Sequence, residues 1–124
     1  MPYDFEGWAT KNDLECADGL TIKKDAFRVN DGKTVPLVWN HQHNKVSDVL
    51  GHAVLENRDE GVYAHCSFND TQAGRDAKKA VLHGDVTALS IWANNLHQVG
   101  MDILHGVIRE VSLVLAGANP GAFI

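Results

Sequence analysis

The sequence has few cysteines, only three prolines, no excess of positive charge and no long hydrophobic run. Its two cysteines, Cys16 and Cys66, are too few for a disulfide framework, and a domain of this length does not need one. We therefore predict two reduced thiols that act as small hydrophobic residues. No stretch approaches the roughly 20 apolar residues of a membrane-spanning helix, and the first residues lack the basic and apolar regions of a signal peptide. The sequence predicts a soluble intracellular protein with no membrane partner.

Clustered positive charge is also missing. The 11 Lys and Arg are outnumbered by 16 Asp and Glu, the formal net charge is -5 at pH 7, and the densest basic cluster is the pair Lys78-Lys79. Binding to a phosphate backbone needs clustered Lys and Arg that displace counterions. We therefore expect no nucleic-acid partner.

What the sequence does contain is alternation of apolar and polar residues over short stretches, which is typical of β-strands. Residues 62–68 alternate in this way after a turn at 59–61, and they predict a hairpin with residues 49–56. Residues 88–94 and 107–116 complete the predicted strands, with a polar loop around 97–100. A further stretch places five residues on one strand face: Val35, Leu37, Trp39, His41 and His43.

One stretch predicts a helix, from about residue 71 to 83. Asp70 or Thr71 can cap its N-terminus, Lys78 and Lys79 lie toward its C-terminal end, and Gly84 ends it. A shorter helical turn is expected at residues 24–28. The 124 residues, 44% of them hydrophobic, suit one domain over residues 1–124. The predicted fold is β-rich α+β, a small antiparallel β-barrel or twisted, partly closed sheet with one main helix.

The chain offers residues for nucleophilic acyl transfer, which needs a hydroxyl or thiol, a base and a group that orients the base. Histidine is the natural base near neutral pH. His41 lies where an apolar strand meets a polar loop, a place at which a rigid scaffold can hold a catalytic group beside solvent. From its position alone, a polar residue at a strand end that binds nothing is the more common case. Seven histidines are available: His41, His43, His52, His65, His83, His97 and His105.

Ser90 is the candidate nucleophile, although it lies within an apolar strand. A serine in such a place is often a small residue whose hydroxyl bonds to the backbone. The sequence contains no Gly-x-Ser-x-Gly turn, which argues against an α/β-hydrolase arrangement.

Glu110 is the candidate orienting group. Strand alternation places it on one face with Ile108, Ser112 and Val114, and a carboxylate among apolar neighbours is costly unless it is hydrogen-bonded. A bond from an imidazole N–H would satisfy it, but a solvent-facing Glu110 or a pair with Arg or Lys also fits the pattern. Ser112 shares this face and is the rival serine. Backbone N–H groups or Arg109 are candidates for stabilising an oxyanion, although alternation aims Arg109 away from Glu110.

A metal-binding hydrolase is the alternative from a different class. His41-Gln42-His43 places two histidines on one strand face, and His65, Cys66 or His105 could supply a third ligand. No spacing such as His-Glu-x-x-His supports this hypothesis. We predict no metal and no cofactor.

Several segments occur in a recognisable order along the chain. They are Phe5-Glu6-Gly7-Trp8-Ala9-Thr10, Val35-Pro36-Leu37-Val38-Trp39-Asn40-His41, Gly51-His52-Ala53, Leu89-Ser90-Ile91, Glu110-Val111-Ser112-Leu113-Val114 and Ala118-Asn119-Pro120-Gly121-Ala122. This order, from about residue 5 to 122, resembles the prohead (capsid maturation) serine proteases of tailed phages, the HK97-type family. The resemblance implies a fold similar to that of the herpesvirus assemblins, a small β-barrel with peripheral helices. It also implies that Ser90 is the nucleophile, His41 the general base and Glu110 the third member, where assemblins have a second histidine.

The function implied by the resemblance is timed proteolysis inside the immature capsid, in the cytoplasm of a bacterial host. Scaffold protein and major capsid protein are the implied substrates, with self-cleavage, and a homo-oligomer is possible because assemblins are activated by dimerisation. Two features depart from the family. His43 stands where relatives more often have an acidic or small polar residue, so it competes with His41. The sequence ends at Ile124 without the charged tail of many relatives. A non-catalytic capsid-assembly module is a further alternative.

Overall fold

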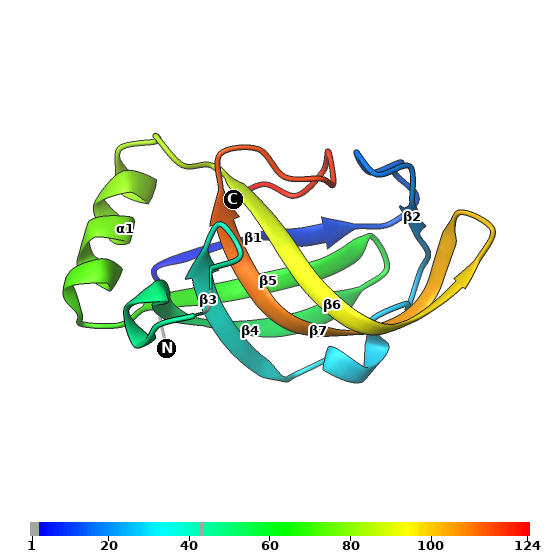
Figure 1. Cartoon of the computed structure of the whole chain (residues 1–124), viewed down its shortest axis with the longest axis horizontal. Coiled ribbons are helices and arrows are strands. Elements are labelled where there is room, and N and C mark those ends of the chain that lie inside the picture. The colour runs from blue at the N-terminus through cyan, green and yellow to red at the C-terminus, as the bar shows by residue number, and fades with distance from the viewer. Residues whose placement is uncertain (1–2, 43) are drawn as a thin grey trace.

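The computed structural model describes residues 3–42 and 44–124. Strands dominate it, with a single α-helix among the described residues (Figure 1). That helix is not long and apolar enough to cross a membrane. The elements are β1 (Phe5–Lys11), β2 (Thr21–Ile22), a 3-10 helix (Arg28–Asn30), β3 (Thr34–Trp39), a second 3-10 helix (Val46–Asp48), β4 (Val49–Arg58), β5 (Gly61–Phe68), α1 (Gln72–Leu82), β6 (Ala88–Val99) and β7 (Asp102–Val114).

The strands form one curled sheet. Its order is β1-β5-β4-β3-β7-β2, and β6 pairs with β7 beside this path. Most neighbours are antiparallel, but β3 and β2 each run parallel to β7. Figure 1 shows β6 and β7 running together across the sheet of β1, β5 and β4, with α1 at the end opposite the β6–β7 turn. This architecture confirms the predicted β-rich fold with one main helix.

Alternating side chains from the curled strands fill the core. Leu37, Leu55, Leu89 and Val111 come from β3, β4, β6 and β7, and all are essentially inaccessible to solvent. Burial of such side chains contributes about 1.5–3 kcal/mol each to folding. Cys66 belongs to this core as a free thiol, and its burial raises the thiol pKa to about 12. The prediction that the cysteines are unpaired is confirmed.

The locally encoded elements agree with the sequence. The hairpin of β4 and β5 forms as predicted, and Thr71 Oγ1 accepts the Gly74 N–H at 3.0 Å to cap α1. Gly84, with a φ of +78°, follows the helix and permits the left-handed turn that ends it.

Two local predictions were wrong. The predicted loop at residues 97–100 is mostly strand, because residues 97–99 of β6 remain paired with β7. His97 is opposite His105, and Val99 is opposite Asp102. The β6 residues of this ribbon, 95–99, are all exposed, so they need no apolar alternation and the sequence pattern did not predict a strand there. The helical turn expected at residues 24–28 instead becomes a 3-10 helix at Arg28–Asn30.

Candidate active site

The structure brings the three predicted site residues together. The imidazole of His41 lies between the other two: Nδ1 is 2.7 Å from Glu110 Oε1, and Nε2 is 3.0 Å from Ser90 Oγ. The His41 side chain is 38% exposed, so solvent reaches the ring, whereas that of Glu110 is 4% exposed. A histidine held by a buried carboxylate on one nitrogen and a serine on the other is the geometry of an acyl-transfer triad.

Strand β7 is the centre of this arrangement. Glu110 lies on β7, and Ser90 lies on the antiparallel neighbour β6. In the register of these two strands Ser90 is opposite Ser112 and Trp92 is opposite Glu110. On the other side β3 runs parallel to β7 and ends at Trp39, opposite Leu113. His41 therefore leaves β3 next to the strand that carries Glu110.

The backbone after β3 turns sharply. Asn40 and His41 have φ values of +48° and +58°, a region that residues other than glycine rarely adopt. The Gln42 N–H donates to the Trp39 carbonyl at 2.9 Å and closes the turn. The prediction that alternation continues from Trp39 to His41 was therefore wrong, because the strand has already ended. His43 lies outside the described residues.

Ser112 holds the turn in place. Its hydroxyl accepts the backbone N–H of His41 at 2.9 Å and donates to Glu110 Oε1 at 3.0 Å. The side chain is fully buried, and both roles of the hydroxyl are in use. Ser112 is thus poorly placed to compete with Ser90 as nucleophile. Its position two residues from Glu110 was visible in the sequence, but its contact with His41 was not.

Among the described residues, Glu110 has no Arg or Lys partner. Its Oε1 accepts bonds from the His41 ring and the Ser112 hydroxyl, and its Oε2 is buried without a hydrogen-bond partner. Neither the solvent-facing Glu110 nor the Arg or Lys pair is what the structure shows. Arg109 points away, as alternation predicts: its Nε donates to Asn94 Oδ1 at 2.7 Å on the exposed side.

The loop after β7 passes close to the strand residue before Ser90. A Cβ atom on Gly117 would lie 2.5 Å from the Leu89 carbonyl oxygen, so only glycine permits this approach. Residues 115–118 are not in a strand, and their N–H groups donate to no described protein acceptor. They are available backbone donors near the candidate nucleophile.

The described residues do not assemble the alternative metal site. Among residues 3–42 and 44–124 no three His, Cys, Asp or Glu side chains lie close enough to hold a metal ion. His65 instead packs between two carboxylates, with Nε2 3.0 Å from Glu56 and Nδ1 3.1 Å from Glu6 without hydrogen-bond alignment. His105 pairs with His97 on the exposed hairpin.

The cluster around His65 carries shifted pKa values. Burial alone lowers the pKa of His65, but the contacts with Glu56 and Glu6 outweigh it, so the pKa lies above its ordinary value. Arg58 first, and then His65, lower the pKa of Glu56 to about 2. This cluster lies on β1, β4 and β5, away from the strands that hold Ser90 and Glu110.

Comparison with known proteins identifies the fold and the family. The crystal structure of the KSHV protease in complex with a hexapeptide phosphonate inhibitor matches with a TM-score of 0.69 and 14% identity, over 95% of this chain. The chain spans 61% of the length of that protease chain, and identity this low shows likeness of fold. No curated protein matches the sequence. Residues 5–124 match the family described as caudovirus prohead serine protease, and the chain therefore belongs to that family of serine peptidases.

Proposed function

We propose that the chain is a serine endopeptidase in which Ser90 is the nucleophile, His41 the general base and Glu110 the group that orients the base. One observation carries the proposal: the His41 ring bridges Ser90 Oγ at 3.0 Å and Glu110 Oε1 at 2.7 Å. Family membership supports the reaction class, and the two contacts of His41 support the proposed roles.

The contact with Glu110 sets the tautomer of His41. An ionised carboxylate only accepts hydrogen bonds, so Nδ1 carries the proton and Nε2 presents its lone pair to the Ser90 hydroxyl. Nε2 takes the Oγ proton as Oγ attacks the peptide carbonyl carbon, and it then gives that proton to the departing amine. Water, deprotonated by the same nitrogen, attacks the acyl-enzyme and releases the acid and free Ser90.

Two further elements complete the proposed site. The free N–H groups of residues 115–118 stabilise the oxyanion, and a single such donor is typically worth about 3 kcal/mol. Ser112 is a positioning residue, since its hydroxyl joins the His41 backbone to the Glu110 carboxylate at 2.9 and 3.0 Å.

The family points to the biological role. We propose that the enzyme cleaves scaffold and major capsid proteins inside the immature capsid, in the bacterial host, and that it also cleaves itself. The family description supports capsid-related substrates in general. The same proposal includes association of copies of this chain into a homo-oligomer.

The test has two parts: labelling by a fluorophosphonate and, in a separate reaction, incubation of the unlabelled protein with the scaffold protein of its own capsid. Ser90→Ala and His41→Ala should each abolish labelling and cleavage, and the double variant should lose little more. Ser47→Ala, at an exposed serine of the second 3-10 helix, is the matched control. Cleavage retained by Ser90→Ala would refute the mechanism. Absence of any labelling or cleavage by the natural chain would favour the non-catalytic assembly module.

A further inference from the structure

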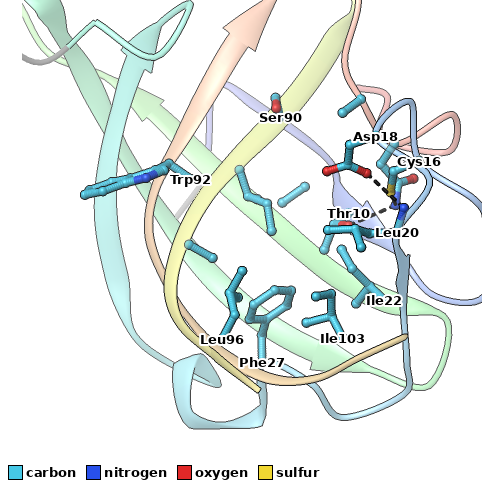
Figure 2. Close-up of a pocket in the computed structure, with 15 residues that line it drawn as sticks. Thr10, Cys16, Asp18, Leu20, Ile22, Phe27, Ser90, Trp92, Leu96 and Ile103 are labelled. Carbon is cyan, nitrogen blue, oxygen red and sulfur yellow. Dashed lines mark hydrogen bonds between the residues drawn. The ribbon is translucent and has the colours of Figure 1, made fainter. Parts of the chain in front are cut away.

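A pocket of about 220 Å³ opens beside Ser90, between β6 and the segment that joins β1 to β2. In Figure 2 the side chains of Phe27, Ile22, Ile103 and Leu96 gather on one side of β6, whereas Trp92 points away on the other. Whole ligand clefts usually measure about 300–1,000 Å³, so this pocket suits one side chain rather than a bound cofactor.

The inner surface of the pocket is apolar. Two polar residues in its wall bond to each other, since Asn119 Nδ2 donates to Thr10 Oγ1 at 3.0 Å and also to the Lys11 carbonyl at 2.8 Å. Burial, helped by the charge of Asp18, raises the pKa of the Cys16 thiol, which keeps it neutral. Apart from Asp18, the wall therefore offers no charged partner, and a polar side chain that enters this space would lose more water contacts than it regains.

The edge of β6 next to the pocket is open. β6 pairs only with β7 among the described strands. On its other edge the Leu89 N–H donates to the Ala122 carbonyl, and the Ile124 N–H donates to the Thr87 carbonyl. Alternation along an antiparallel ladder then aims the N–H and carbonyl of Ile91 at the same edge, where no described residue bonds to them.

We propose that a substrate segment adds to β6 as an antiparallel strand at Ile91 and places an apolar side chain in this pocket. The inference rests on the proposed function of Ser90. Residues 122–124 already lie antiparallel on the same edge, one pair of hydrogen bonds away, so the edge accepts an added strand.

The direction of the strand decides which part of the substrate enters the pocket. β6 runs from Ser90 through Ile91 and Ala93 to Leu96, and all four residues line the pocket. An antiparallel peptide runs toward Ser90, so its residues over the pocket precede the scissile bond. The residue opposite Ile91 shares the face of the Ile91 side chain, which packs toward the core, and so its side chain points into the pocket.

Asp18 is the one charged residue of the pocket lining, so a preference for a lysine side chain is the competing specificity. It is exposed, and its Oδ1 accepts the Leu20 N–H at 3.0 Å. Because this carboxylate is solvated and already bonded, we assign recognition to the apolar walls. A preference for lysine that depends on Asp18 would contradict this assignment.

The test uses acetyl-tripeptide diphenyl phosphonates, whose reaction joins Ser90 Oγ to phosphorus and releases phenol. The parent has alanine at all three positions, and leucine, lysine or glutamate replaces each alanine in turn. At one position leucine should raise the second-order labelling rate about tenfold or more over alanine, as apolar pockets discriminate side chains. Ala93→Leu should remove that gain, whereas His97→Leu, on the same strand beyond the pocket, should keep it.

The outcomes separate the two proposals. If a small fluorophosphonate fails to label Ser90 in the natural chain, the catalytic assignment fails. If it labels Ser90 in every variant but leucine gives no gain, or the gain survives Ala93→Leu, the pocket inference fails alone. If Ala93→Leu does not fold, Leu96→Ala replaces it as the test variant, because it enlarges the pocket at a half-exposed residue. This variant should reduce the rate gain from leucine severalfold. Faster labelling by the lysine peptide, lost in Asp18→Asn, would overturn the apolar specificity.

Discussion

Replacing Ser112 with alanine tests how the fold holds His41, the proposed general base. The change removes the acceptor of the His41 N–H and a donor to Glu110 Oε1, at 2.9 and 3.0 Å. Loss of a buried hydrogen-bond partner costs about 1–3 kcal/mol. His41 has a φ of +58°, a conformation that persists only where its surroundings enforce it. We therefore expect most of the loss to fall on the position of the His41 turn.

The free energy lost in Ser112→Ala can be converted into an expected change in the rate of the chemical step. Displacing His41 from its productive position by about 1–3 kcal/mol slows the chemical step about 5- to 150-fold, since 1.4 kcal/mol is tenfold. The assay is inactivation by a peptide phosphonate, which separates the binding constant from the limiting rate of labelling. A positioning role lowers the limiting rate and leaves binding unchanged, whereas general loss of structure weakens both.

Two variants complete this experiment. Ser112→Cys retains a weak donor and acceptor at a similar size, so its rate should lie between those of the natural chain and Ser112→Ala. Ser47→Ala should match the natural chain. If Ser112→Ala folds, as judged by circular dichroism and thermal unfolding, and labels at the natural limiting rate, the positioning argument is refuted.

Three other predictions follow from the structure. Glu110→Gln should slow labelling by on the order of 10²- to 10⁴-fold, because the amide neither stabilises the imidazolium nor enforces the tautomer; an unchanged rate in a stopped-flow assay would show that another group orients His41. Gly117→Ala should reduce labelling with the fold retained, because the new Cβ would meet the Leu89 carbonyl at 2.5 Å and must displace the loop that carries the proposed oxyanion donors; a natural rate would place those donors elsewhere. The raised pKa of His65 favours its protonated form in the folded state, so its stabilisation is complete below the unfolded value of 6.5 and is lost as pH rises through the folded pKa. Urea unfolding should show stability falling above about pH 6.5, and His65→Gln should flatten that dependence; an unaltered pH profile in the variant would contradict the role of this histidine.

The sequence by itself determined the elements whose signals are local. The hairpin of β4 and β5 follows from alternation around a turn, and α1 follows from Thr71 at one end and Gly84 at the other. Alternation also placed Glu110 and Ser112 on one face of β7, which forms as a strand over that stretch. These features depend on residues a few positions apart, so the order of side chains is enough to predict them.

Tertiary structure alone decided how the site comes together. The parallel pairing of β3 with β7 joins segments about 70 residues apart in the chain, and no local pattern specifies that register. The left-handed turn at Asn40 and His41 breaks the alternation and aims the imidazole between Glu110 and Ser90. Ser112 and Leu113, on a different strand, accept the backbone N–H groups of His41 and Asn40 and help to hold this turn. The chemistry of each residue was thus readable from the sequence, whereas their distances depended on long-range strand pairing that only the folded chain provides.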